Sequence, residues 1–120
     1  MTYTGIKFHI RIKTESDLND LSRIIGRVLN LQFTRTLNDE EDESEEGDIF
    51  GLKVSLSFNM NDKSDPGRAC QFAGIPDYNI AGTNFESLHD ISNYLMHFLN
   101  NACNEKWYIP SPDEIRNDLL

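Results

Sequence analysis

The sequence predicts one α+β domain over residues 1–120: a mostly antiparallel sheet of about four strands, with two main helices packed on it and a short C-terminal helix. Three observations predict this class. Some segments alternate apolar and polar residues, as half-buried strands do, and others repeat apolar residues every three or four positions, as amphipathic helices do. The length of 120 residues suits a single core. No internal repeat and no linker divides the chain.

The first third of the chain predicts a strand, a helix and a second strand. Residues 5–13, GIKFHIRIK, alternate and predict a half-buried strand. A helix follows, because apolar residues recur at helical spacing as far as Asn30, a residue type that often ends helices. Thr14, paired with an aspartate three residues later, or Ser16 is its expected N-cap. The polar face of the first strand is a basic row, which we expect to be solvated: Lys7, His9, Arg11 and Lys13.

The middle of the chain predicts three strands and the loops between them. Residues 31–37, LQFTRTL, and 49–60, IFGLKVSLSFNM, both alternate, and the second pattern is the clearest in the chain. Residues 38–48, NDEEDESEEGD, join these two strands, so we expect a long acidic hairpin loop. Residues 61–67, NDKSDPG, consist of turn-forming types. Residues 68–75 then predict a shorter strand.

The last third predicts a loop and two helices. The loop carries Tyr78. Thr83 and Glu86 have the spacing of a capping box, and the apolar residues that follow predict one helix face of about five turns. Residues 111–120 begin Ser-Pro-Asp-Glu, which is typical of the start of a short helix.

The acidic segment, residues 38–48, carries nearly all of the net charge of −9. Eight of its eleven residues are carboxylates, which leaves 12 acidic and 11 basic side chains in the other 109 residues. A pI of about 4.6 disfavours nucleic acid and anionic membranes as partners, because both would repel the chain. A basic protein surface is therefore the expected counterpart. The carboxylates are Asp39, Glu40, Glu41, Asp42, Glu43, Glu45, Glu46 and Asp48.

The sequence contains no pattern that predicts catalysis, a metal site or a cofactor. Glu86 and His89 match half of a di-iron helix motif, but a second copy is missing. His97 follows His89 by eight residues, so the two do not form a zinc pair one helical turn apart. Cys70 has no histidine near it in sequence, and the chain lacks phosphate-binding glycine motifs. We expect a protein that is not an enzyme and has no cofactor.

Two further features of the chain concern its location. We expect a cytoplasmic protein, because no apolar run is long enough for a membrane helix and the N-terminus lacks the apolar centre of a signal peptide. Cys70 and Cys103 are expected to be free thiols of the core in that compartment.

The acidic segment has two readings. Blocks of like charge often form flexible loops that only keep a protein soluble. Alternatively, the segment is an electrostatic docking surface for a cationic partner, whose encounter it would accelerate. Docking also needs apolar anchors, for which Phe50 and Tyr78 are the expected residues. Trp107 and Tyr108 are further aromatic candidates, and packing in the core is the competing role for Trp107 and Phe50.

The chain resembles the small, acidic, cytoplasmic immunity proteins of bacterial toxin–immunity systems, in particular those of contact-dependent growth inhibition. The resemblance lies in the opening GIKFHIRIKTESDLNDL, in NDEEDESEEGD before IFGLKVSLSF, and in FESLHDISNYLMHFLNNACN ahead of WYIPSP. It implies an inhibitor of one cognate toxin domain, often a basic nuclease, whose active or substrate-binding surface acidic residues cover. The oligomeric state is not predicted.

Two other functions remain open. The first is an acidic mimic of nucleic acid, as in phage-encoded nuclease inhibitors, whose carboxylates would be spaced over a surface rather than clustered. The second is a small enzyme or ligand-binding domain, which would need a pocket that holds His89, Cys70 or Asp77 with a strongly shifted pKa.

Overall fold

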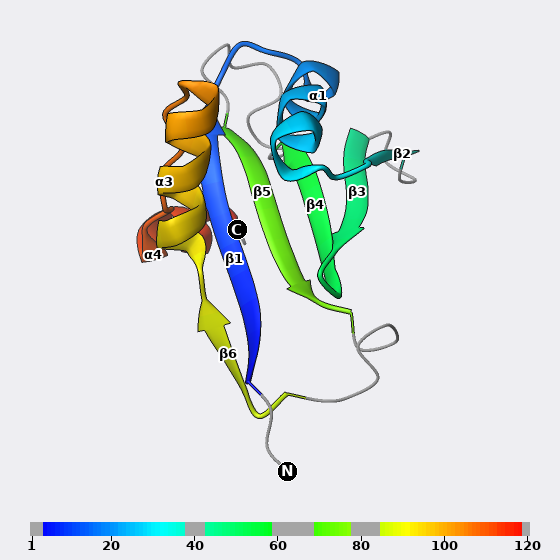
Figure 1. Ribbon diagram of the computed structural model, residues 1–120. Coiled ribbons are helices and arrows are strands. Elements are labelled where there is room, and N and C mark those ends of the chain that lie inside the picture. Colours follow the sequence, from blue (N-terminus) through cyan, green and yellow to red (C-terminus); the bar gives the residue numbers. More distant parts are fainter. Residues whose placement is uncertain (1–3, 38–42, 59–68, 78–84, 119–120) are drawn as a thin grey trace.

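The computed structural model describes residues 4–37, 43–58, 69–77 and 85–118, which form one sheet with helices α1 and α3 on one face (Figure 1). The predicted α+β class is confirmed, with six strands among the described residues where the sequence predicts about four. The strands are β1 (Thr4–Lys13), β2 (Thr34–Leu37), β3 (Glu43–Ile49), β4 (Leu52–Phe58), β5 (Ala69–Pro76) and β6 (Ser87–Asp90). The helices are α1 (Leu18–Leu29), α3 (Ser92–Cys103) and α4 (Pro112–Asp118).

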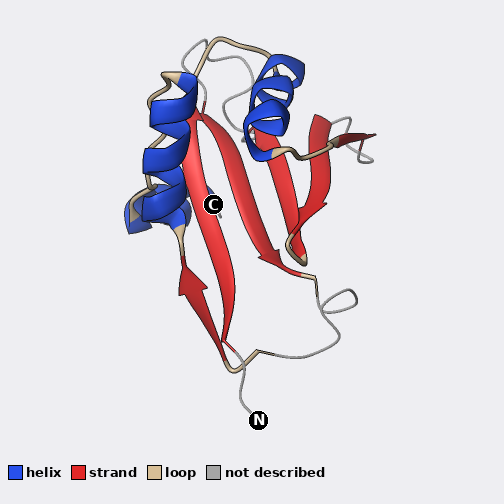
Figure 2. Cartoon of the chain, viewed as in Figure 1, coloured by secondary structure: helices blue, strands red, loops and turns tan. Residues whose placement is uncertain are grey.

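The strands follow the order β2-β3-β4-β5-β1-β6 across the sheet (Figure 2). Neighbouring strands are antiparallel, except that β6 runs parallel to β1. The sequence predicts β1, β2, β4 and β5, although β2 and β4 are shorter than the alternating patterns in which they lie. β3 and β6 are the two strands that it does not predict.

The core lies between the sheet and the two helices. The alternation of β1 turns Phe8 and Ile10 toward this core, and Phe72 of β5 lies directly across from Ile10. Phe72 is fully buried, and its ring centroid lies 4.9 Å from that of Phe8 and 6.2 Å from that of Trp107. Gly74 faces Phe8 across the strand pair, where an added Cβ would overlap the Phe8 ring. The predicted core role of Trp107 is thereby confirmed.

Helix α1 follows the predicted apolar spacing, but its N-cap is Asp17 and not Thr14 or Ser16. The Asp17 carboxylate accepts a hydrogen bond from the backbone N–H of Asp20 at 2.8 Å. Thr14 instead accepts one from the N–H of Ser16 at 3.0 Å, within the turn before the helix. Asn30 ends the helix as predicted, in the left-handed conformation with φ 53°.

Helix α3 begins at Ser92, so the helix start predicted from Thr83 and Glu86 is wrong. Residues 87–90 instead form β6, which pairs with the first part of β1 and satisfies its outer backbone edge. Asp90 then turns the chain into α3, because its carboxylate accepts hydrogen bonds from the N–H of Ser92 at 2.9 Å and from its hydroxyl at 2.5 Å. Thr83 itself lies outside the described residues.

The C-terminal segment continues along the same edge of β1. Asn100 of α3 bonds to both backbone groups of Trp107, at 2.6 Å and 3.1 Å. Tyr108 then exchanges two backbone hydrogen bonds with Arg11, at 2.7 Å and 2.8 Å. Arg11 is only 4% exposed, so the prediction of a fully solvated basic row is wrong at this position.

The final helix, α4, has the predicted capping box. Ser111 and Glu114 exchange side-chain to backbone hydrogen bonds, both of 3.2 Å. Figure 1 places α4 behind α3 and β1, away from the face that α1 and α3 cover.

Candidate functional site

The second half of the acidic segment is a strand, which corrects the expected hairpin loop over residues 38–48. Glu43–Ile49 form β3, which pairs with both β2 and β4 and therefore separates them. The pairing satisfies the backbone on both sides, and it sets no carboxylate directly across from another. Glu46 lies opposite a threonine and a serine, and Asp48 lies opposite Lys53.

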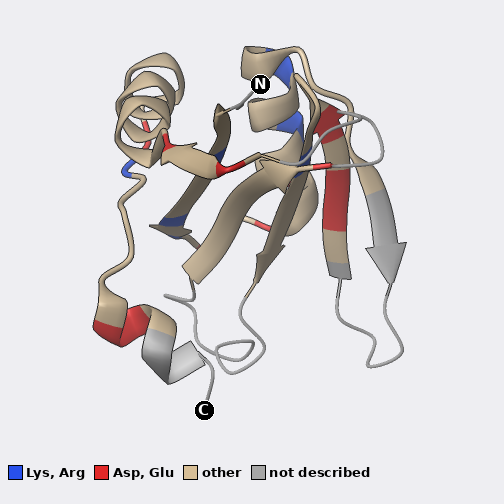
Figure 3. Ribbon diagram, turned by 90° about the horizontal axis from the view of Figure 1, so that it is seen from below, with Lys and Arg blue, Asp and Glu red and all other residues tan. Residues whose placement is uncertain are grey.

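The carboxylates of β3 point to opposite faces of the sheet, because strand residues alternate. Glu45 lies opposite the buried Leu56, on the helix-covered face, and is only 6% exposed. Glu46 is half-buried and Asp48 is exposed, both on the other face. Acidic residues run along β3, which is the mostly red strand in Figure 3. Glu46 and Asp48 are therefore accessible to a partner, whereas Glu45 is not. Six further residues that the sequence predicts as partner contacts have side chains outside the described part of the chain: Asp39, Glu40, Glu41, Asp42, Glu43 and Tyr78.

Phe50 occupies the turn that joins the acidic strand β3 to β4. Ile49 and Leu52 pair across this turn, so Phe50 and Gly51 form a two-residue hairpin loop. Both have positive φ, 53° for Phe50 and 77° for Gly51, as a type I′ turn requires. Such a conformation is unusual for a bulky side chain. Phe50 is also 90% exposed, so the competing prediction that it packs in the core is wrong.

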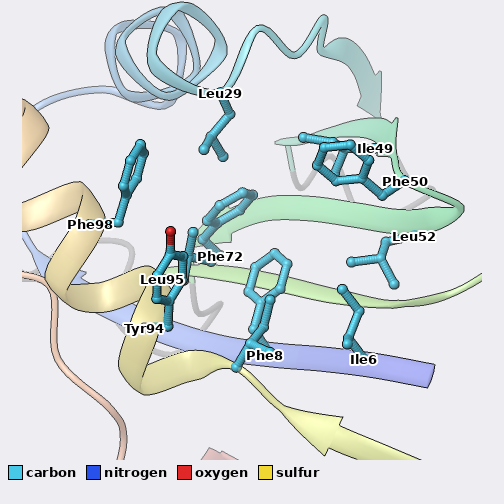
Figure 4. A pocket seen from close by; sticks show the side chains of 11 residues that line it. Ile6, Phe8, Leu29, Ile49, Phe50, Leu52, Phe72, Tyr94, Leu95 and Phe98 are labelled. Atoms are coloured by element: carbon cyan, nitrogen blue, oxygen red, sulfur yellow. The ribbon is translucent and has the colours of Figure 1, made fainter. Parts of the chain in front are cut away.

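An apolar groove lies between α3, the core face of the sheet and the β3–β4 turn. It encloses about 220 Å³ and opens to the surface. Figure 4 shows Tyr94 and Phe98 on one side of the groove and Ile49 and Phe50 on the other. The Tyr94 hydroxyl is the only polar side-chain atom among the lining residues. These residues are Ile6, Phe8, Leu29, Ile49, Phe50, Leu52, Phe72, Ile91, Tyr94, Leu95 and Phe98.

The rim of the apolar groove on α3 is aromatic and uncharged. Tyr94 is 70% exposed and Phe98 is 40% exposed, and their rings stack with centroids 6.3 Å apart and planes 15° apart. The helix sequence SNYLMHFLNNAC contains no Asp, Glu, Lys or Arg, although much of its surface faces solvent. Depletion of charge and enrichment of aromatic residues are features of protein interfaces. The sequence pattern did not indicate this rim, because Phe98 belongs to the apolar helix face predicted after Glu86 and Tyr94 lies outside that face.

The residues considered for catalysis or metal binding do not come together in the groove. His89 on β6 and His97 on α3 are exposed, and neither lines the groove. Cys70 is fully buried in the core, and Asp77 lies just after β5. Within the described ranges, no group of three His, Cys, Asp or Glu side chains could hold a metal ion.

Two titratable groups have shifted pKa values, and both shifts have structural causes. The Ser92 hydroxyl donates to Asp90 and lowers the pKa of that carboxyl below 3.8, with help from the Ser92 N–H and Lys7. Burial raises the pKa of the Cys103 thiol, and the nearby Glu105 raises it further. Neither Cys70 nor Cys103 forms a disulfide bond.

A polar cluster on the other face of the sheet has a structural role. His9 Nε2 lies 3.0 Å from Gln71 Oε1, and the Arg11 guanidinium donates to both residues at 3.4 Å. These contacts supply hydrogen-bond partners for a buried cation.

Among the helices that the structure describes, none is long and apolar enough to cross a membrane.

No protein-family model, curated protein or solved structure matches this chain.

Proposed function

We propose that the protein binds and neutralises a basic toxin domain, with a nuclease as the expected target, without catalysis of its own. This is the role of an immunity protein of the contact-dependent growth inhibition type, which the sequence resembles. The observation that carries the proposal is Phe50, an exposed aromatic residue in a left-handed turn at the end of the acidic strand.

Phe50 does not stabilise the fold at its position in the turn. Left-handed φ costs an L-residue with a Cβ about 1–2 kcal/mol, and glycine or asparagine would fit this turn better. A side chain that is 90% exposed recovers almost none of that cost through burial. Full burial of a phenylalanine is worth about 1.5–3 kcal/mol, so a partner that covers Phe50 would offset the strain. Strained residues of this kind concentrate at functional sites.

The charge of the chain indicates a basic partner. The net charge is −9, and the accessible Glu46 and Asp48 lead directly to Phe50. A potential of this sign extends about 8 Å at physiological salt and raises association rates toward a cationic surface by about 10–1000-fold. The acidic segment therefore acts on encounter, and Phe50 acts on the lifetime of the complex.

The alternatives have less support from the geometry. A mimic of nucleic acid needs carboxylates spaced regularly over one surface, but β3 turns Glu45 and Glu46 to opposite faces. An enzyme or ligand-binding domain would need a pocket with polar groups. The apolar groove contains none of the residues named for that role, which are His89, Cys70 and Asp77.

The test is partner capture followed by a growth assay. The immobilised chain is exposed to lysate of its native host at low salt, and bound proteins are eluted with a salt gradient and identified by mass spectrometry. The expected result is one stoichiometric basic protein that stops growth when it is expressed alone and is harmless when it is co-expressed with this chain. A mixture of basic proteins that elute together at moderate salt would contradict the proposal, as would a partner that leaves growth unchanged.

A matched pair of variants sharpens this test. Phe50→Asn removes the exposed ring, and Asn101→Ala removes an exposed asparagine side chain on α3, outside the groove. Protection from the captured toxin should be lost or weakened by Phe50→Asn and retained by Asn101→Ala. Equal protection by both variants would show that Phe50 is not an anchor.

A further inference from the structure

We infer that the apolar groove receives one large apolar side chain, aromatic or long aliphatic, from a cationic segment of the protein partner. This inference rests on the proposed function, and it names the chemistry of the contact that holds the partner. The groove provides the depth that the exposed Phe50 ring alone lacks.

The size of the groove limits its occupant to about one side chain. Its volume is about 220 Å³. An engineered apolar cavity of about 150 Å³ in another protein holds one benzene molecule. An aromatic ring with the methylene that links it to a backbone therefore fits, whereas a nucleotide or a fatty acyl chain would not be enclosed.

The lining favours a protein side chain over a small molecule. Small-molecule sites combine apolar walls with a few polar groups that fix the orientation of the ligand. Here the Tyr94 hydroxyl is the only polar side-chain atom in the lining. A side chain from a partner needs no such group, because the surrounding interface sets its orientation. Pockets of this kind, desolvated and near the centre of an interface, hold the residues that dominate binding energy.

The rim supports an interface around the groove. Tyr94 and Phe98 form one wall and Phe50 stands on the opposite side, so a partner that inserts one side chain would also cover these three exposed rings (Figure 4). α3 contains no Asp, Glu, Lys or Arg, so covering this face desolvates none of these charges. The rim is therefore suited to an interface from which water is excluded.

The charge of the chain decides between a cationic partner and a second copy. Two copies, each with a net charge of −9, repel one another, and the repulsion opposes self-association through this face. A segment that carries Lys or Arg beside its apolar residue is attracted instead. Asp48 precedes Phe50 by two residues but points to the face of the sheet opposite the groove, so the attraction toward such a segment comes from the net charge of the chain.

The test uses peptides of defined chemistry and the isotope-labelled full chain. The probe is a lysine-rich peptide with a single central tryptophan, and binding is followed by NMR at low salt. The first control peptide has alanine in place of tryptophan, and the second has glutamate in place of every lysine. The expected result is that the backbone signals of Tyr94, Leu95 and Phe98 shift most. Each control peptide should bind at least about tenfold more weakly.

Variants of the protein complete the experiment. Tyr94→Ala combined with Phe98→Ala should weaken the probe at least about tenfold, because it removes one wall of the groove. Asn93→Ala combined with Asn101→Ala, exposed positions on the same helix, should change binding by less than about twofold. Retained NMR dispersion in the first variant excludes unfolding as the cause of lost binding.

Several outcomes would overturn the inference. These are no shifts at millimolar probe, shifts away from the groove, equal binding of either control peptide, or a dimer in sedimentation equilibrium that Tyr94→Ala with Phe98→Ala abolishes. The peptide result does not depend on any captured toxin, so the two proposals fail separately. If a toxin is neutralised equally well by the wild type and by the variant without Tyr94 and Phe98, the groove inference fails and the proposed function stands.

Discussion

The substitution Phe50→Asn should stabilise the free protein while it weakens partner binding. Phe50 has φ 53° in a two-residue turn and is 90% exposed. Asparagine adopts the left-handed conformation far more readily than phenylalanine and is a preferred residue of type I′ turns. A change that improves the fold and harms the function would show that Phe50 serves the partner and not the core.

The magnitude follows from two opposing contributions. Relief of backbone strain is worth up to about 1–2 kcal/mol. Little apolar burial is lost, because only the small covered part of the ring contacts the groove. The expected net gain in the free energy of unfolding is about 0.5–1 kcal/mol, which corresponds to a rise in Tm of about 2–4 °C for a chain of this length.

Urea unfolding and calorimetry measure this gain, and Gly51→Ala is the matched control. Gly51 has φ 77°, and an added Cβ would meet no atom within 4 Å, so only backbone strain can act there. The control should lose about 1 kcal/mol. A loss of stability in Phe50→Asn would refute the reasoning, since the ring would then support the fold. Unchanged partner binding would refute the anchoring role.

Three further predictions concern the elements that place the site. Gly47→Ala should destabilise the protein by about 1–3 kcal/mol, measured by urea unfolding, because its Cβ would lie 2.8 Å from a backbone carbonyl of the α1–β2 connection. Ser92→Ala should cost about 1–3 kcal/mol, because a buried hydroxyl that serves two partners is lost. Because the pKa of Asp90 is lowered in the folded protein, its contribution to stability is complete well above pH 3.8 and is lost as the pH falls through and below that value. Ser92→Ala should therefore reduce the loss of stability in acid, measured by thermal melts at a series of pH values. Thiol titration of the native protein should modify Cys103 slowly and leave Cys70 unmodified until denaturant is added; rapid modification of Cys70 would contradict its burial.

Local patterns predicted those parts of the fold that local interactions determine. The alternation of β1 faces the core as expected, and the alternation of β5 places Phe72 and Gly74 on the same face. The ends of α1 at Asn30 and of α4 at Ser111 depend on hydrogen bonds within a few residues, so their residue types were sufficient signals.

The strands β3 and β6 were missed because tertiary pairing creates them. Aspartate, glutamate and glycine have low strand propensity, so the sequence of β3 reads as a loop until β2 and β4 supply partners on both sides. The residues of β6 fit a helical apolar spacing, but the free edge of β1 binds them as a strand and moves the start of α3 to Ser92. Neither effect is visible from local pattern.

The candidate site, like the fold, could be predicted from the sequence only in part. The sequence identified the acidic segment and Phe50, but it could not tell which carboxylates face solvent, because that depends on the register of β3. The apolar groove is formed by residues from most of the chain length, from Ile6 to Phe98, and so has no local signature. Its nearest signal is the absence of Asp, Glu, Lys and Arg along α3.

The most direct test of the account is the salt dependence of the association rate with the captured toxin, measured by stopped flow. Glu46→Gln with Asp48→Asn removes two accessible carboxylates, and Glu15→Gln with Asp20→Asn removes the same charge before and at the start of α1. The first pair should slow association several-fold at low salt and flatten its salt dependence, and the second should have a much smaller effect, with thermal stability nearly unchanged in both. Equal effects of the two pairs would mean that net charge alone acts, and unchanged rates in both would contradict electrostatic docking by the acidic strand.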